Sequence, residues 1–511
     1  MNRLTFIGSI QLNSPSTGGG VQTKNQHFLR YILSKNVDCR VFDTWKKKSV
    51  LSLIMSLIYI VRTKRSEPII LSISTRGAYY IAKILNLSTQ YVNAISIILA
   101  IIITNIAVIE LLKWSKKYIV CEKTNSKIIL ILICYIIIWN FMYIENMYFL
   151  ESCVMALSVL FYILSSKELV EKQKNYLLKS TIYTILGVIS YQGTIGFIFL
   201  LTTLMTFIKN PKDYKSNICD IIKSGITAVI AVSIDMCIVK EFEKIIGITQ
   251  TRLGEISNIT INIKIIYLET INILKETCNL YPHYLLIILT SITLILLTIN
   301  QIINKKEKTI ILKSLIIIIV AILSSSVTFI ISMTSFYTGR LRFCIGSMLG
   351  ILFLYIAAKT NIFNLSKENI ISRLIKIVFL IYFSTTIISN ILNIYEHKQV
   401  NKLEKTECEE ISKNIEKYEK ETNNKIEKIQ IILITDEPQK TYYTQSHVKN
   451  VLTYSGIRSN WSAVGCINFY TKKNLKETNI KIPKEELEEI NKNTDLQICI
   501  GDTLYVKCYM Y

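Results

Sequence analysis

The chain has 511 residues, half of them hydrophobic, and a formal net charge of +22. Its mean hydropathy of +0.37 excludes an ordinary soluble protein, because several apolar runs approach or exceed the roughly 18–20 residues that cross a bilayer core. We interpret the excess of Lys and Arg as the charge that cytoplasmic loops of membrane proteins collect, rather than as a nucleic-acid-binding surface. Composition therefore predicts a multi-pass α-helical membrane protein whose partner is the lipid bilayer.

Residues 1–90 predict a small, half-Rossmann-like α/β segment. Strands are expected at "LTFIGSI" (4–10), "VDCRVFDT" (37–44) and "EPIILSIST" (67–75), with helices between and after them. Alternating strands and helices favour a parallel sheet. The Gly18–Gly20 turn before the first helix resembles the start of a GT-B glycosyltransferase domain, truncated here, where loop amides approach a sugar or phosphate. A plain structural turn explains the glycines equally well, so no nucleotide-sugar site is assigned.

About ten transmembrane helices are expected in residues 91–396. The candidate segments are 91–112, 128–143, 147–165, 176–190, 193–208, 220–239, 284–303, 309–332, 338–358 and 371–395. The loops between them are alternately rich in Lys and either very short or balanced in charge. By the positive-inside rule, the Lys-rich loops face the cytoplasm. The remaining loops and everything after Tyr395 are then expected on the outer face of a cell membrane.

The polar tail, residues 397–511, predicts a soluble extracytoplasmic α/β domain. It opens with a charged helix from Glu404 to Lys428, continues with a strand at "KIQIILIT" (428–435), and ends with two strands around a Gly-Asp-Thr turn in "LQICIGDTLYVKCYMY" (496–511). Cys466, Cys499 and Cys508 lie in this tail, and whether any of them form a disulfide is left open by the sequence.

Several charged and amide side chains fall near the outer ends of the predicted spans. Each charged group inside a membrane segment costs about 2.5–3.5 kcal/mol on insertion scales, so it usually faces a cavity or a partner. The candidate site residues are Glu145, Asn146, Tyr148, Glu151, Tyr191, Gln192, Asp235, Arg340 and Arg342. Two structural explanations stay open: interfacial Tyr and Arg often anchor helix ends, and Glu145 could lie in solvent.

Three stretches resemble a known family. "FMYIENMYFLESCVMALSV" (141–159), "ISYQGTIGFIF" (189–199) and "FYTGRLRFCIGSMLG" (336–350) are similar, in order and outer-face placement, to motifs of bacterial O-antigen-conversion glucosyltransferases, which are membrane enzymes of GT-C type. The "GDTLYV" of the tail is also similar, and the resemblance covers about residues 91–511. The family more often has Asp at the position of Glu151.

The resemblance implies a membrane glycosyltransferase with a GT-C-like fold. Its donor would be a sugar, glucose in the first instance, linked to polyprenyl phosphate, and its acceptor a surface glycan. Glu151 and Glu145 are then the candidate catalytic carboxylates, and Arg340 or Arg342 the ligand of the lipid phosphate. The other candidates would bind substrate. A lipid-phosphate donor requires no metal or other cofactor, and no His or Asp cluster in the sequence suggests a metal.

One departure from the family affects the expected activity. Related enzymes have a further first transmembrane helix and an outer loop with an acidic pair, the expected catalytic base. The α/β segment stands in that place here, and no Asp-Asp pair occurs before residue 130. We therefore expect reduced or absent activity unless Glu145 or Glu151 substitutes for that pair.

Two other classes of function remain. One is a non-catalytic remnant or assembly partner for surface-polysaccharide enzymes, which the missing acidic pair favours. The other is a transporter of lipid-linked sugars. The sequence shows no internal repeat of its helices and contains six prolines in total, whereas many such transporters have repeats with matching Gly- or Pro-broken helices.

Overall fold

The computed structural model divides the chain into two compact units, residues 1–387 and 388–511, and each is described by itself. The residues that the structure describes are 4–8, 39–43, 89–121, 124–149, 151–246, 263–264, 267–268, 270–271, 280–282, 284–304, 309–327, 339–360, 370–434, 456–457, 462–478 and 497–509.

The N-terminal segment contributes two short strands to the description. β1 (Leu4–Gly8) and β2 (Cys39–Asp43) pair in parallel, with Leu4 opposite Cys39. Both lie within runs that the sequence predicts as strands, and their parallel pairing agrees with the predicted sheet. The predicted third strand, the Gly18–Gly20 turn and the helices of this segment lie outside the described residues.

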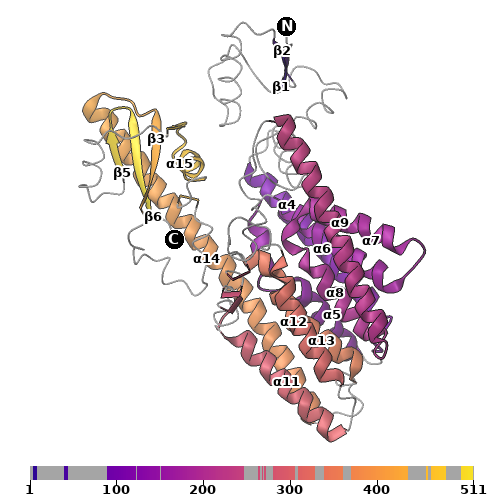
Figure 1. Cartoon of the computed structure of the whole chain (residues 1–511). Coiled ribbons are helices and arrows are strands. Elements are labelled where there is room, and N and C mark those ends of the chain that lie inside the picture. Colours follow the sequence, from indigo (N-terminus) through magenta and orange to yellow (C-terminus); the bar gives the residue numbers. More distant parts are fainter. Residues whose placement is uncertain are drawn as a thin grey trace. The chain divides into compact units, whose positions relative to one another are not determined.

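Apolar helices dominate the rest of the first unit (Figure 1). They are α4 (Thr89–Ser115), α5 (Thr124–Ile138), α6 (Ser152–Glu171), α7 (Tyr176–Ser190), α8 (Gly196–Lys209), α9 (Tyr214–Ile246), α11 (Leu285–Asn304), α12 (Thr309–Ser324), α13 (Phe343–Lys359) and α14 (Ile370–Thr422). Every predicted span overlaps one of these helices. In the described part of the chain, seven helices are long and apolar enough to cross a membrane, and α5, α7 and α12 are shorter. The structure thus agrees with a helical membrane protein.

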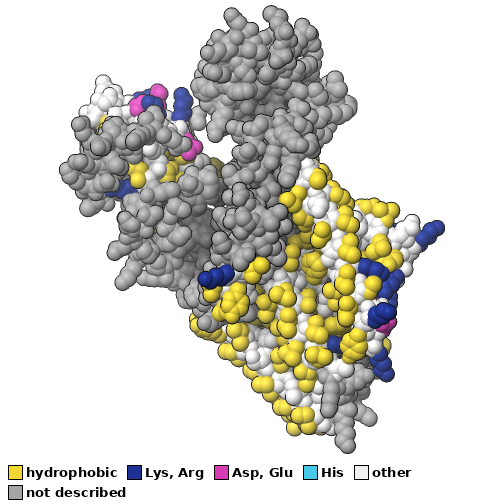
Figure 2. Space-filling model, viewed as in Figure 1, with side chains coloured by type: hydrophobic (Ala, Val, Ile, Leu, Met, Phe, Trp, Pro, Cys, Tyr) yellow, Lys and Arg dark blue, Asp and Glu magenta, His cyan; other side chains and the backbone are white. Residues whose placement is uncertain are grey.

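The surface of the helical unit is apolar over a broad face. Figure 2 shows hydrophobic side chains covering this face, with Lys and Arg side chains gathered along one edge. Large aliphatic side chains point outward at high exposure, such as Ile98 (57%), Val229 (67%) and Ile302 (73%). Contiguous apolar surface of this extent is rare on soluble proteins and is typical of surface that lipid covers.

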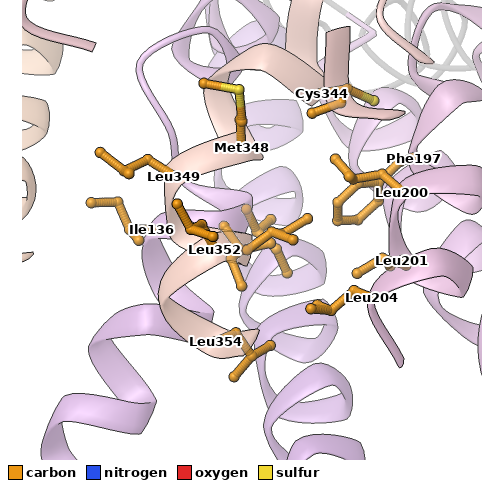
Figure 3. Close-up of a cluster of buried hydrophobic side chains, with 14 of the residues drawn as sticks. Ile136, Phe197, Leu200, Leu201, Leu204, Cys344, Met348, Leu349, Leu352 and Leu354 are labelled. Atoms are coloured by element: carbon orange, nitrogen blue, oxygen red, sulfur yellow. The ribbon is translucent and has the colours of Figure 1, made fainter. Parts of the chain in front are cut away.

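Helix α13 lies at the centre of the bundle and packs against α5, α8 and α12. Figure 3 shows Leu352 of α13 facing side chains of α8, while Ile136 of α5 lies near Leu349. Gly350 allows α5 to approach closely, since a Cβ there would lie 2.9 Å from the Ile137 Cγ1, and Gly346 makes room for the Asn140 Oδ1, which would lie 2.2 Å from a Cβ. Small residues four apart are a common way for membrane helices to pack.

Helices α6, α8 and α13 run in the same direction. This follows from two lysine hydrogen bonds that join the C-terminal ends of these helices. The Lys209 Nζ donates to the Val170 carbonyl at 2.6 Å, and the Lys359 Nζ donates to the Ile208 carbonyl at 2.7 Å. The last carbonyls of a helix lack intrahelical partners and carry the negative end of its dipole, so an ammonium there is stabilising. The N-terminal ends of the three helices consequently meet at the opposite end.

The second unit contains the C-terminal half of α14 and a small sheet. Its elements are β3 (Lys428–Ile434), α15 (Ala463–Thr471), β4 (Lys476–Glu477), β5 (Gln497–Ile500) and β6 (Thr503–Tyr509), and the strand order is β4-β3-β6-β5. β3 is parallel to β4 and β6, whereas β5 and β6 form an antiparallel hairpin. The hairpin turns at Gly501, whose φ of +58° favours glycine.

The strands β3, β5 and β6 confirm the strand predictions made for the tail. The charged helix differs from its prediction at both ends: α14 continues unbroken through the predicted boundary at 396/397, and it ends at Thr422 rather than at Lys428. Buried residues of α14, such as Ile411 and Ile415, pack with Ile429 of β3 and Leu504 of β6. The polar half of α14 is therefore part of the folded tail, because its apolar stripe completes the core of the sheet.

Candidate functional site

Three short 3₁₀ turns meet at the N-terminal ends of the parallel helices. They are η1 (Tyr143–Tyr148) before α6, η2 (Gln192–Thr194) before α8, and η5 (Gly339–Arg342) before α13. η5 contacts both η1 and η2, and we call the three together the turn cluster. Helix N-termini carry partial positive charge and unpaired N–H groups, so the turn cluster favours anionic and carbonyl-bearing groups.

Glu145 joins η1 to η5 through its carboxylate. The side chain is 1% exposed. The Glu145 Oε1 accepts a hydrogen bond from the Gly339 N–H at 3.2 Å, and the Oε2 accepts one from the Arg340 N–H at 2.8 Å. Charge-assisted bonds to backbone N–H groups at a helix start are among the stronger hydrogen bonds in proteins. The Glu145 carboxylate thus links η1 to η5. The open alternative that Glu145 lies in solvent is wrong.

Arg340 is bonded to Glu145 through its backbone, and its side chain packs against an aromatic ring. Its guanidinium lies over the Phe149 ring, 4.0 Å from the centroid, in cation–π geometry. The Arg340 Nε is buried and has no hydrogen-bond partner within the described residues. The Arg340 guanidinium also lies near the Tyr191 hydroxyl: burial raises the pKa of Tyr191, and the nearby guanidinium opposes that rise. The site thus presents one oriented cation beside a buried phenol.

Asn146 is fully buried beside Glu145, and neither its amide nitrogen nor its amide oxygen has a hydrogen-bond partner in the described part of the chain. A buried amide without partners costs on the order of 1–3 kcal/mol. Unsatisfied buried polar groups of this kind tend to occur at functional sites, where a ligand or ordered water completes them.

Arg342 is the second arginine of η5, and it is 1% exposed. Its Nη1 donates to the Ser326 Oγ at 3.1 Å and lies 3.4 Å from the Ser325 carbonyl oxygen. These bonds tie η5 to the turn after α12. Because its guanidinium is buried among protein acceptors, Arg342 is less suited than Arg340 to binding a lipid phosphate.

Gln192 and Asp235 form a pair between η2 and α9. The Gln192 Nε2 donates to the Asp235 Oδ2. Asp235 is 1% exposed, and its Oδ1 has no hydrogen-bond partner among the described residues. Burying a carboxylate in a membrane segment is costly. Asp235 therefore combines a position next to the turn cluster with an oxygen that remains able to accept.

Glu151 lies at the margin of the turn cluster and differs from its predicted position. It falls within the predicted span 147–165, but α6 begins only at Ser152, and Glu151 is the half-buried residue before the first turn. The turn η1 occupies the first part of the predicted span, and at its start the Asn140 Oδ1 accepts the N–H groups of Met142 and Tyr143. Tyr148 ends this turn and is half-buried.

The structure adds residues that the sequence analysis does not single out. Phe149 orients Arg340, Asn140 caps η1, and Ser326 holds Arg342. Gly193 lies under the site: a Cβ there would be 2.5 Å from the Tyr191 Cζ and 2.6 Å from the Leu341 Cδ2. The Tyr-Gln-Gly sequence could have indicated Gly193, whereas the roles of the other residues depend on contacts distant in sequence.

No protein-family model, curated protein or solved structure matches this chain. Within the described ranges, His, Cys, Asp and Glu side chains do not gather in groups of three or more that could bind a metal ion.

Proposed function

We propose that the chain is a membrane glycosyltransferase that transfers a sugar, glucose in the first instance, from polyprenyl phosphate to a surface glycan. The observation that carries the proposal is the turn cluster. It combines three helix N-termini, an arginine stacked on Phe149, and the buried amide of Asn146. Phosphate favours helix N-termini and arginine, and a sugar's hydroxyls suit amides and carboxylates.

The same proposal includes ten membrane crossings. α5, α7 and α12 have 15, 15 and 16 residues, and the adjoining turns lengthen the first two. Lysines at the C-terminal ends of α6, α8 and α13 belong to the cytoplasmic side by the positive-inside rule. The turn cluster, at the other ends of these helices, then faces the outer leaflet. Two, four and eight of the proposed crossings precede η1, η2 and η5, and an even number before each turn is consistent with all three turns lying on one face.

The proposed chemistry assigns different roles to the two glutamates. Both oxygens of Glu145 accept backbone N–H groups, so Glu145 acts as a positioning residue. Glu151 lies half-buried at the margin of the turn cluster, just before the first turn of α6, and we assign it as the general base, with Asp235 as the alternative carboxylate. The base removes the proton of the attacking acceptor hydroxyl as the bond between the sugar C1 and the phosphate oxygen breaks.

The leaving group in this reaction is polyprenyl phosphate. Arg340 and the N–H groups at the helix N-termini would stabilise the negative charge that develops on it, which is the usual role of pre-oriented donors. Asn146, Tyr148 and Gln192 would orient the sugar, and Tyr191 would support Arg340. Arg342 is assigned to holding η5 in place.

A transfer assay with purified chain and lipid-linked glucose tests the proposal. We expect Glu151→Gln to lower kcat by about 10²–10⁴-fold if it removes the general base, and Arg340→Lys to lower turnover because stacking and directional donors are lost. Glu168→Gln, near the far end of α6, is the matched control and should keep activity. Turnover that survives Glu151→Gln and Asp235→Asn would exclude both carboxylates as the base.

A second candidate is a non-catalytic partner of surface-polysaccharide enzymes. It is favoured by the structural use of Glu145, together with the absence of an acidic pair before residue 130. Analysis of surface glycan before and after gene deletion, combined with the transfer assay, separates the two. A lost side-branch sugar with turnover by the purified chain supports the enzyme, whereas the same loss without turnover supports the partner.

A further inference from the structure

Two cysteines face each other in the core of the second unit. Cys408 lies on α14 and is completely buried, while Cys466 lies on α15 and is half-buried. Both belong to the same hydrophobic cluster, which also contains Ile411, Ile457 and Ile467. Both are free thiols in this structure, and the Cys408 side chain is close enough to Cys466 to raise its pKa. These two side chains, distant in sequence, are thus side by side in the fold.

Neighbouring contacts fix this arrangement. A Cβ at Gly456 would lie 3.2 Å from the Cys466 Sγ, so the chain at 456–457 passes directly over Cys466. The adjacent Ile457 N–H donates to the Glu404 Oε1 at 3.3 Å. Glu404 and Cys408 are four residues apart on α14 and therefore lie on one face of that helix. Cys466 is held against this face from two directions.

We propose that Cys408 and Cys466 form a disulfide that joins α15 to α14 in the mature protein. The inference rests on the outer placement of residues 388–511, because stable disulfides form in oxidising compartments. It goes beyond the proposed activity, since the pair lies in a different unit from the turn cluster.

The oxidant is a disulfide-bearing thiol oxidoreductase of that compartment. The Cys466 thiolate, the more accessible one, attacks a sulfur of the oxidoreductase disulfide and releases one oxidoreductase thiolate. The Cys408 thiolate then attacks the Cys466 sulfur and releases the second. Two protein thiols become one disulfide, and the oxidoreductase gains the two electrons and the two protons. The neighbouring thiol, burial and Glu404 raise the pKa of Cys466, so unassisted oxidation is expected to be slow.

The test uses intact chain taken from membranes into denaturant with a thiol-blocking maleimide. Peptide mass spectrometry without reduction should find one linked pair containing Cys408 and Cys466, two hydrogens lighter than the separate peptides. After reduction, both cysteines should become labelled by a second maleimide. Cys499→Ser is the matched control and should keep the linked pair, whereas Cys408→Ser should release Cys466 as a free thiol.

Two outcomes would overturn the proposal, and they are distinguishable. In the Cys408→Ser variant, a membrane-impermeant maleimide applied to whole cells reports the side on which Cys466 lies. Free Cys408 and Cys466 in the wild type, with Cys466 labelled from outside in the variant, would show that the disulfide does not form although the topology holds. Free cysteines without outside labelling would show that the second unit is cytoplasmic. Neither result bears on transfer activity measured with the purified chain.

Discussion

The Glu145 carboxylate binds the backbone of Arg340 rather than the Arg340 side chain. The Glu145 Oε2 accepts the Arg340 N–H at 2.8 Å, which leaves the guanidinium to stack on Phe149. A carboxylate and an arginine 195 residues apart in sequence thus meet without forming the ion pair that their charges would suggest. The position of Arg340 consequently depends on Glu145, and a change at either residue should affect the other.

Glu145→Ala should destabilise the protein and also lower transfer activity. Removing the carboxylate leaves the N–H groups of Gly339 and Arg340 without their acceptor, at a cost of about 1–3 kcal/mol. Thermal unfolding of the detergent-solubilised chain measures the loss. Glu110→Ala is the control, because Glu110 takes part in surface ion pairs with Lys113 and Lys167, which typically contribute about 0–1 kcal/mol. Equal losses in the two variants would contradict the role of Glu145.

Gly193→Ala should displace Tyr191 and weaken the site. The new methyl group would lie 2.5 Å from the Tyr191 Cζ, and overpacking of this kind costs about 1–3 kcal/mol. Gly225→Ala is the control, since its methyl would have its nearest neighbour at 3.8 Å. There we expect no loss and even a gain of about 0.5–1 kcal/mol, because alanine favours helix over glycine. Unfolding midpoints of both variants, with their transfer rates, test this difference.

Lys209→Met should destabilise the end of the bundle where the C-termini of α6, α8 and α13 meet. Methionine keeps most of the apolar stem but removes the ammonium that donates to the Val170 carbonyl at 2.6 Å. The expected cost is about 1–3 kcal/mol, the usual range for a hydrogen bond to a charged group. Lys212→Met, at an exposed position three residues later, should unfold at the same temperature as the wild type. A similar loss at both positions would indicate a general effect of charge.

Acid should loosen the second unit through Glu419. Burial alone would raise the pKa of Glu419, but the Ile426 N–H and the Lys473 ammonium lower it below its usual value. A carboxyl whose pKa is lower in the folded state contributes stability above its unfolded pKa of about 4.3 and loses that contribution as pH falls through the folded pKa. Protection of β3 and β6 amides against hydrogen exchange, corrected for intrinsic rates, should therefore decrease below about pH 4.3.

Glu419→Gln should remove much of this pH dependence in the intact protein while lowering protection at neutral pH. Glu409→Gln is the matched control, because Glu409 and Lys405 form an exposed pair on the same helix, with more than half of each side chain exposed. An unchanged acid response in Glu419→Gln would show that another group is responsible.

The sequence by itself determined the elements that follow from local pattern. Long apolar runs specify membrane helices because a bilayer leaves backbone groups no partner outside the segment, and each predicted span overlaps a helix. Strand patterns likewise predicted the strand at 428–435 and the two strands within 496–511, where β3, β5 and β6 form. The alternation of strands and helices in residues 1–90 predicted a parallel sheet, in agreement with the pairing of β1 and β2. Their position near predicted span ends also drew attention to Glu145, Asn146, Gln192, Asp235 and Arg340.

Only the tertiary structure decided how these residues are used. Whether Glu145 is solvated, catalytic or structural depends on two N–H groups almost two hundred residues away, and a one-dimensional pattern carries no information about that distance. The same holds for Glu151, which lies just before α6 rather than within the predicted span, and for Cys408, which meets Cys466 through packing of α14 and α15. Local pattern fixes where helices form, whereas the close packing of distant side chains fixes what their polar groups contact.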